Sequence, residues 1–206
     1  MEIIRSVLGV FAAYLVGSFP TSFIVGKLKG VDVRKKGSGN VGATNVLRTV
    51  GKLPALITLV VDILKGAAAV TIIADYFYTQ GSHLGPEFYR AVLGLSVIAG
   101  HNWTVFLRFK GGKGVATSCG VFSVLLPKAM IVGLLVFILT LAIAKYVSLA
   151  SIHLAITVPV VAAMTGESLE YTLFSVTICM IICYRHKGNI KRLLSGNENK
   201  IGHTKS

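Results

Sequence analysis

Two short segments of this sequence combine glycines, small polar side chains and a basic residue, a composition suited to binding an anion. Residues 37–48 read GSGNVGATNVLR and residues 109–118 read FKGGKGVATS, and each runs into an apolar segment. Glycine lets backbone N–H groups approach an anion closely, and the N-terminus of a following helix adds unpaired donors and the positive end of the helix dipole. The two segments therefore predict a site for phosphate or carboxylate.

The second segment does not match the phosphate loop of ATPases. That motif requires a glycine six positions before its lysine and a Ser or Thr directly after it. Relative to Lys113, these positions hold Leu107 and Gly114. ATP hydrolysis is therefore not expected. For either segment alone, the alternative interpretation is a flexible connector whose lysines only obey membrane topology.

Further polar groups that could take part in chemistry lie toward the C-terminal end. Ser148 and Ser151 are three residues apart, so they share one face of a helix. His186 and Asn189 follow the last apolar run beside a basic cluster, and a histidine can act as an acid or a base near neutral pH. The alternative interpretations are serines that pack membrane helices together and a charge cluster that stops membrane insertion.

Two opposite charges, Asp62 and Lys65, lie inside an apolar run and share a helix face, so they can neutralise each other. Ionisable groups within a span usually face the protein interior or a cavity. The pair is either a link to a polar site or a structural pair between helices. His101, at the end of another apolar run, is either a packed residue or part of the glycine-segment site.

The sequence gives no indication of a metal or another cofactor. Its three cysteines are scattered in apolar surroundings, without a CxxC motif or a histidine at ligand spacing. They are expected to be small buried hydrophobic residues.

The elements that must position these groups are membrane helices. Hydrophobic residues make up 53% of the 206-residue chain and charged residues only 14%, against about 25% charged in an ordinary globular protein. Apolar runs fall at about 3–27, 53–78, 88–108, 114–126, 129–145, 147–165 and 168–185. The fourth is too short to span a bilayer as a helix. We predict an all-α, polytopic bundle of about seven helices forming one domain over residues 1–206. Five or six spans, or one kinked helix across 114–145, are the alternatives.

The charge distribution orients this bundle. The net charge is +13, and with seven spans most of the 21 basic residues fall on one side, in segments 26–52, 108–113, 145 and 185–206. The positive-inside rule places these segments in the cytoplasm and the N-terminus outside. Because topology explains the charge, nucleic acid is not expected as a partner, whereas weak attraction to anionic membrane lipid is.

The assembled segments resemble one family, the bacterial integral-membrane acyltransferases that acylate glycerol 3-phosphate from acyl phosphate. The matching segments are GSFPTSFIVGK (17–27), GSGNVGATNVLR (37–48), DILKG (62–66), GHNWTVFLRFKGGKGVATS (100–118), YVSLASI (146–152) and RHKGNIKRLLSGNENKIG (185–202). One departure is Asn197, where the family typically has threonine. The His-x₄-Asp motif of another acyltransferase class does not occur in the chain.

This resemblance implies a single seven-helix acyltransferase domain in the cell (inner) membrane, with its active site on the cytoplasmic face. The implied products are 1-acylglycerol 3-phosphate and phosphate, the first acylation of phospholipid synthesis. No cofactor is implied, and an acyl-phosphate synthase that supplies the donor is a possible partner. Because acyl phosphate is a mixed anhydride with a good leaving group, we expect the glycerol hydroxyl to attack directly, without a covalent acyl-enzyme. Oxygens of the acyl phosphate, or His186 as the rival base, would take the proton.

On the same basis, residues of the two glycine segments and of the C-terminal region are expected to form the site. The expected catalytic residues are Lys113, Ser151, His186 and Asn189. The expected phosphate- and substrate-binding residues are Ser38, Gly39, Asn40, Asn45, Arg48, Gly111, Gly112, Gly114 and Thr117. No metal ligand is expected.

Two other classes of protein would also place basic glycine segments at a membrane face. An anion transporter or channel needs a polar path, but Asp62 and Lys65 are the only clear charges within the spans and no inverted repeat is visible. A purely structural membrane protein leaves both glycine segments unexplained.

Overall fold

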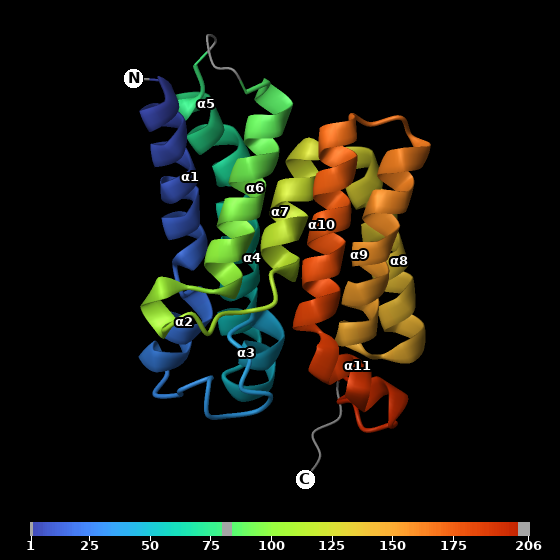
Figure 1. Cartoon of the computed structure of the whole chain (residues 1–206). Coiled ribbons are helices and arrows are strands. Elements are labelled where there is room, and N and C mark those ends of the chain that lie inside the picture. Colours follow the sequence, from blue (N-terminus) through green and yellow to red (C-terminus); the bar gives the residue numbers. More distant parts are fainter. Residues whose placement is uncertain (1, 80–83, 202–206) are drawn as a thin grey trace. The chain divides into compact units, whose positions relative to one another are not determined.

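The computed structural model describes residues 2–79 and 84–201, and within these ranges every regular element is a helix (Figure 1). The elements are α1 (Glu2–Ser18), α2 (Thr21–Leu28), α3 (Ala43–Thr49), α4 (Lys52–Ala68), the π-helix η1 (Ala69–Ile73), α5 (Ala74–Phe77), α6 (Pro86–Asn102), the 3₁₀ helix η2 (Val105–Leu107), α7 (Val115–Leu125), α8 (Pro127–Ala144), α9 (Val147–Met164), α10 (Leu169–Arg185) and α11 (Lys187–Leu194). The predicted all-α class is confirmed. The end of the predicted basic tail, 202–206, lies outside the described residues.

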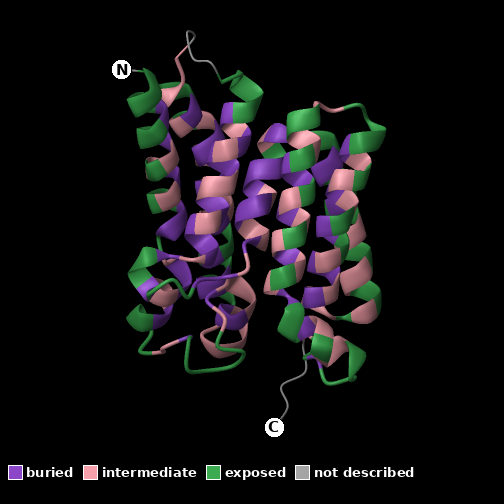
Figure 2. Cartoon of the chain, in the orientation of Figure 1, coloured by how far each residue is buried: buried purple, intermediate pink, exposed green. Residues whose placement is uncertain are grey.

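The chain forms two compact units, residues 1–125 and 126–206, and each is considered by itself. Among the residues that the structure describes, four segments are long and apolar enough to cross a membrane: Glu2–Leu28, Lys52–Phe77, Pro127–Ala144 and Val147–Met164. Figure 2 shows that, within each unit, many helices carry buried residues on one face and exposed residues on another. Many of the outward side chains are large and apolar, such as Ile138 and Leu139 on α8. Such faces suit a lipid environment.

Residues 114–145 form two helices, so the single kinked helix considered for this stretch does not form. Leu126, between α7 and α8, has φ −137° and ψ 57°, and Pro127 begins α8. The proline ring disfavours a helical conformation for the residue before it and is well suited to the first helical position.

In unit 1, glycines allow α1 and α6 to pack with their backbones in contact. A Cβ atom at Gly17 would lie 2.0 Å from the Val97 carbonyl oxygen, and one at Gly100 would lie 2.2 Å from the Tyr14 carbonyl oxygen. The backbone of each helix therefore contacts the other at a glycine, a close approach that small residues permit in membrane helix packing.

α4 and α7 also cross with their backbones in contact at glycines. A Cβ atom at Gly66 would lie 2.1 Å from the Thr117 carbonyl oxygen, and one at Gly120 would lie 2.0 Å from the Ile63 carbonyl oxygen. Because Thr117 is near the start of α7 and Gly66 is about halfway along the segment Lys52–Phe77, α7 begins partway along that segment. The loop before α7 is thereby carried into the interior of the unit.

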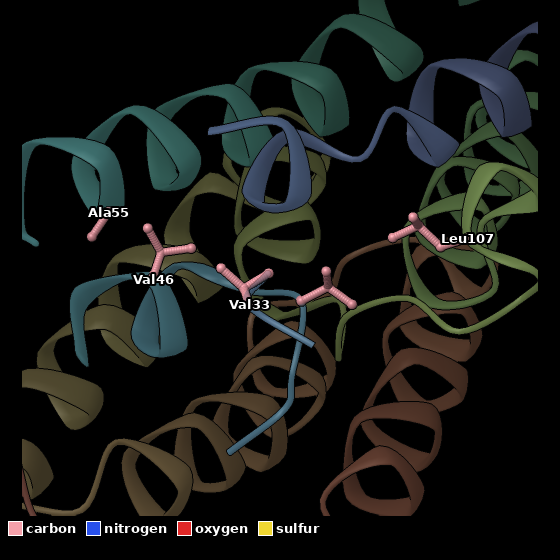
Figure 3. Packing of buried hydrophobic residues seen from close by; sticks show 5 residues of the cluster. Val33, Val46, Ala55 and Leu107 are labelled. Carbon is pink, nitrogen blue, oxygen red and sulfur yellow. The ribbon is translucent and has the colours of Figure 1, made fainter. Parts of the chain in front are cut away.

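A small apolar cluster joins the first glycine segment to the helices around it (Figure 3). It consists of Val33, Val41, Val46, Ala55 and Leu107, all buried. These residues come from the segment before α3, from α3, from α4 and from η2. Their packing holds the first glycine segment beside the turn that leads into the second.

In unit 2, α8 and α9 form a hairpin, and α10 and α11 pack against α9. Lys145 makes the α8–α9 turn in the left-handed conformation, at φ 62° and ψ 16°. The backbone N–H of Ile201 donates to the Lys145 carbonyl oxygen at 2.8 Å. The C-terminal segment therefore returns to the hairpin turn.

We predict that Gly120→Val will prevent the close crossing of α4 and α7, because its side chain would meet the Ile63 carbonyl. Overpacking of this kind costs about 1–3 kcal/mol or more. Gly85→Val is a matched control, because no atom lies within 4 Å of a Cβ at Gly85. Thermal unfolding of the purified proteins in detergent should show a clear loss for Gly120→Val alone. Equal melting temperatures for the two variants would contradict the crossing.

Candidate active site

Asn45 shapes the first glycine segment from within. Its Nδ2 donates to the carbonyl oxygens of Val33 at 2.8 Å and Lys36 at 3.2 Å, and its Oδ1 accepts from the Ser38 N–H at 2.9 Å. The Asn45 side chain is fully buried. A Cβ atom at Gly37 would lie only 2.3 Å from Asn45 Oδ1, and Gly37 has φ 61°. Asn45, expected from the sequence to bind substrate, thus holds the loop in its conformation.

The neighbouring residues of this segment face outward. Ser38 and Gly39 are exposed, Asn40 is half-buried, and the Ser38 hydroxyl accepts from the Asn40 N–H at 3.4 Å. Arg48 lies in the last turn of α3 and is half-buried. Ser38, Gly39 and Asn40 are therefore accessible to a ligand at the surface of the loop.

The acidic residue nearest this loop is paired internally. Arg34 Nη2 lies 2.8 Å from Asp32 Oδ2 and its Nε lies 3.0 Å from Oδ1. Hydrogen bonding to the Arg34 guanidinium holds the pKa of Asp32 well below its usual range, against the opposing effect of desolvation. The pKa of Arg34 is correspondingly raised by the Asp32 side chain. The negative charge of Asp32 is thereby balanced locally by Arg34.

The second glycine segment is bound to the end of α6 through its backbone. The Gly111 N–H donates to the Asn102 carbonyl oxygen at 3.1 Å, and the Gly112 N–H donates to the His101 carbonyl oxygen at 3.0 Å. A Cβ atom at Gly111 would lie 2.1 Å from the His101 carbonyl oxygen. These two amide groups, which were expected to face a phosphate, are used to fix the loop against α6.

Lys113 and Gly114 complete this loop and lead directly into α7. Lys113 is half-buried, and Gly114 has φ 83°, a conformation that favours glycine. The first turn of α7 begins at Val115, so its N-terminal donors follow the lysine immediately. Thr117, in contrast, is fully buried, and its hydroxyl has no hydrogen-bond partner among the described residues.

Beneath the second loop lies a buried cluster of three ionisable side chains. Lys65 Nζ is 2.7 Å from Asp62 Oδ1 and 2.8 Å from His101 Nδ1, and His101 Nδ1 is 3.6 Å from Asp62 Oδ1. The predicted Asp62–Lys65 ion pair is confirmed, and it contacts a polar partner. An ammonium group only donates hydrogen bonds, so Nδ1 of His101 is the acceptor in its contact with Lys65. Sequence spacing could not reveal this contact, because Lys65 and His101 are 36 positions apart.

The two glycine segments meet at a narrow recess in unit 1, whose accessible volume of about 10 Å³ has room for roughly one water molecule. Its lining comes from the α1–α2 break, the first segment, α4, the end of α6 and the second loop: Gly17, Ser18, Phe19, Pro20, Thr21, Ser22, Val41, Asp62, His101, Thr104, Leu107, Gly111 and Gly112. Thr21 is buried, and its hydroxyl has no partner within the described part of the chain. The recess thus offers polar groups beside the loop that carries Lys113.

In unit 2, a buried carboxylate organises the C-terminal candidates. Glu198 Oε1 accepts from Ser148 Oγ at 3.0 Å and from Asn189 Nδ2 at 2.7 Å, while Oε2 accepts from Arg192 Nε at 2.7 Å. Burial alone would raise the pKa of Glu198, but these hydrogen bonds outweigh it and hold the pKa below its ordinary value. Sequence analysis missed Glu198, although it lies in the tail segment that carried the family resemblance.

Ser151 and His186 are also buried in this unit. Ser151 Oγ donates to the Val147 carbonyl oxygen at 2.8 Å, and His186 Nδ1 lies 2.8 Å from the Ile182 carbonyl oxygen. A carbonyl oxygen only accepts, so Nδ1 of His186 carries a proton in this contact. Ser148 and Ser151 share one buried helix face, as their spacing predicted.

The expected site residues therefore divide between the two units. Unit 1 holds those of the two glycine segments, including Lys113, and unit 2 holds Ser151, His186 and Asn189. Within residues 2–79 and 84–201, no group of three His, Cys, Asp or Glu side chains is arranged to hold a metal ion.

The chain is similar to proteins of one kind throughout its length. The family model for glycerol-3-phosphate acyltransferase matches residues 7–196. The glycerol-3-phosphate acyltransferase of Desulforamulus reducens is 41% identical over 204 residues, covering 98% of each chain. That of Geotalea daltonii is 44% identical over 191 residues, covering 92% of this chain and 94% of the relative.

Solved structures agree with these sequence similarities. The glycerol 3-phosphate form of PlsY (YgiH), an integral membrane glycerol 3-phosphate acyltransferase, matches with a TM-score of 0.88 and 37% identity over 96% of each chain. The lysophosphatidic acid form of PlsY matches with a TM-score of 0.86 and 37% identity, over 96% of this chain and 95% of the other.

We predict that Glu198 contributes to a loss of protein stability as the pH falls into the acid range. Because its pKa is lowered in the folded state, its contribution is fully present above the pKa of the unfolded chain and is lost as pH falls through the folded pKa. Glu198→Gln should lower stability at pH 7 by about 1.5–3 kcal/mol, the range for a hydrogen bond to a charged group. It should also flatten the fall in melting temperature between pH 7 and acid pH.

Glu170→Gln is the control for this measurement, because Glu170 is an exposed carboxylate in the first turn of α10. Its melting profile should follow the wild type. A Glu198→Gln protein that kept the wild-type pH dependence would show that another group is responsible.

Proposed function

The chain belongs to the glycerol-3-phosphate acyltransferase family and is an integral-membrane acyltransferase, and from this premise we propose its reaction. The acyl chain passes from acyl phosphate to the 1-hydroxyl of sn-glycerol 3-phosphate. The products are 1-acylglycerol 3-phosphate and phosphate, the first acylation of phospholipid synthesis. The proposal that glycerol 3-phosphate is the acyl acceptor rests on the match, over 96% of the chain, to the glycerol 3-phosphate form of PlsY. The His-x₄-Asp motif of the other acyltransferase class does not occur in the sequence, so that class is not favoured.

The glycine segments of unit 1 are proposed to hold phosphate groups. Lys113 and Arg48 supply positive charge, and Ser38, Gly39, Asn40 and Gly114 supply nearby polar or backbone groups. Charge supports this role, because Asp32 is paired with Arg34 and Asp62 is paired with Lys65. Asn45, Gly111, Gly112 and Thr117 then serve the same site by shaping the loops and the α4–α7 crossing.

The residues of unit 2 are proposed to assist the transfer itself. Ser151 and Asn189 donate hydrogen bonds to phosphate or to the developing oxyanion. The glycerol oxygen bonds to the acyl carbon as the bond from that carbon to the phosphate oxygen breaks, so no acyl-enzyme forms. The hydroxyl proton passes to the phosphate oxygens, or to Nε2 of His186 as the rival base. The Nδ1 contact with the Ile182 carbonyl favours a ring whose Nε2 can accept a proton.

The proposal extends to topology. Residues 1–206 form one acyltransferase domain, and the family match over 7–196, which includes residues of both units, supports this. The domain crosses the membrane with about seven helices, with the N-terminus outside and the C-terminus and active site on the cytoplasmic face of the cell membrane. Support comes from the basic segments 26–52, 108–113 and 185–206, because they contain most of the proposed site residues. An acyl-phosphate synthase would supply the donor.

The reaction is tested with purified protein in detergent, given acyl phosphate and glycerol 3-phosphate together and separately. Phosphate release should require both substrates and should accompany monoacylglycerol phosphate. Acyl-coenzyme A in place of acyl phosphate should give no product. Product from acyl-coenzyme A alone would overturn the proposed donor. No product from either donor, with net phosphate flux across sealed vesicles, would favour the transporter hypothesis instead.

We predict that Lys113→Ala will lower kcat/KM at least about 100-fold, the scale for removing one group that stabilises transition-state charge. Membrane insertion should be unchanged. Lys110→Ala is the matched control, because Lys110 is an exposed lysine of the same loop. Its activity should stay near wild type. Wild-type rates in purified Lys113→Ala would remove Lys113 from the site.

A further inference from the structure

We propose that His101 is a positioning residue for the transfer reaction. In this role its imidazole ring, held by the buried Lys65–Asp62 pair, fixes the loop 110–114 that carries Lys113. The inference rests on the proposed function, because the activity it affects is the use of glycerol 3-phosphate.

The ring is held on one side by buried charge. Lys65 Nζ contacts Nδ1 at 2.8 Å and is itself bound to Asp62 Oδ1 at 2.7 Å. Only 5% of the Lys65 side chain, 4% of the Asp62 side chain and 8% of the His101 side chain are exposed. The ammonium also lies 3.5 Å from the Phe19 carbonyl oxygen, at the break between α1 and α2. Turning the ring would break the buried contact between Nδ1 and the Lys65 ammonium, which makes other orientations of the ring unfavourable.

The opposite edge of the ring lies against the glycine loop. A Cβ atom at Gly112 would lie 2.1 Å from Nε2, 2.9 Å from Cε1 and 3.0 Å from Cδ2 of His101. The Gly112 N–H also donates to the His101 carbonyl oxygen at 3.0 Å. Backbone and ring of one residue therefore locate Gly112, and Lys113 is the next residue in the chain.

This arrangement gives Gly112 a reason to be glycine that does not involve phosphate. The φ angles of Gly111 and Gly112 lie outside the left-handed region, so space and not backbone conformation excludes a side chain at either position. The obstacle at Gly112 is the His101 ring, whereas the obstacle at Gly111 is the His101 main-chain carbonyl. Removing the ring should therefore make room at residue 112 and leave residue 111 as crowded as before.

The test is a double-mutant cycle on kcat and KM for glycerol 3-phosphate, with wild type, Gly112→Ala, His101→Ala and the double variant. Gly112→Ala alone should lower kcat/KM about 100-fold, the cost of misplacing a reacting group by about 1 Å. The loss should lie mainly in kcat, because the displaced Lys113 is proposed to stabilise charge in the transition state. The double variant should be at least tenfold more active than Gly112→Ala. Gly111→Ala should show no such recovery in the His101→Ala background.

A second variant covers the case in which His101→Ala does not fold. His101→Asn keeps an oxygen near the Nδ1 position as a partner for Lys65 but lacks the Nε2 edge. Combined with Gly112→Ala it should give the same recovery. A double variant no better than Gly112→Ala, in both backgrounds, would overturn the positioning role.

Thermal unfolding of the same proteins separates this inference from the proposed function. If the wild type uses neither donor, the proposed function fails, but Gly112→Ala should still melt below wild type and regain stability when the ring is removed. If turnover is present and melting shows no coupling between positions 101 and 112, the inference fails and the function stands.

Discussion

A carboxylate and an ammonium group buried in an apolar helix constrain the rest of unit 1. Asp62 and Lys65 lie within a segment long enough to cross a membrane, where a charge without a partner is costly. The two groups form an ion pair, and Lys65 also contacts His101 Nδ1 and the Phe19 carbonyl oxygen. Lys65 therefore connects α4 with the end of α6 and with the break between α1 and α2. Everything that packs around this cluster must leave its three side chains in place.

The helix crossings make that arrangement possible. Backbone contact at Gly17 and Gly100 brings α1 against α6, and backbone contact at Gly66 and Gly120 brings α7 against α4. Because α7 starts partway along the α4 segment, the loop before it reaches the depth of the buried charges. The loop that carries Lys113 can then pack against His101. Asp32 is paired with Arg34 and Asp62 with Lys65, so neither carboxylate adds an unbalanced negative charge that would repel a bound anion.

The sequence predicted much of this architecture but little of its internal bonding. The apolar runs, the ion pair at positions 62 and 65 and the shared face of Ser148 and Ser151 follow from helical periodicity, and the structure contains them. Glycine-rich composition also located both loops. Composition could not show that the Gly111 and Gly112 amides turn toward α6, because a glycine required by a phosphate and one required by a neighbouring ring look alike in a sequence.

Contacts between distant positions were equally hidden. Lys65 meets His101 and Ser148 meets Glu198 across separations of 36 and 50 positions, so no local pattern links them. Asn45 was expected to bind substrate, and only the folded chain shows its amide bound to the carbonyl oxygens of Val33 and Lys36. Side-chain types identified the region of the site; packing decided which groups face a ligand and which hold the loops.

The most direct test of the central claim is hydrogen exchange at the Gly111 and Gly112 amides, compared between wild type and the Asp62→Asn/Lys65→Met double variant. That variant removes both charges together, so neither is left unpaired, and it also removes the donor to His101. We expect these two amides to exchange severalfold faster, with exchange in α8 and α9 of the other unit unchanged. Unchanged protection at Gly111 and Gly112 would contradict the claim that the buried pair holds the loop.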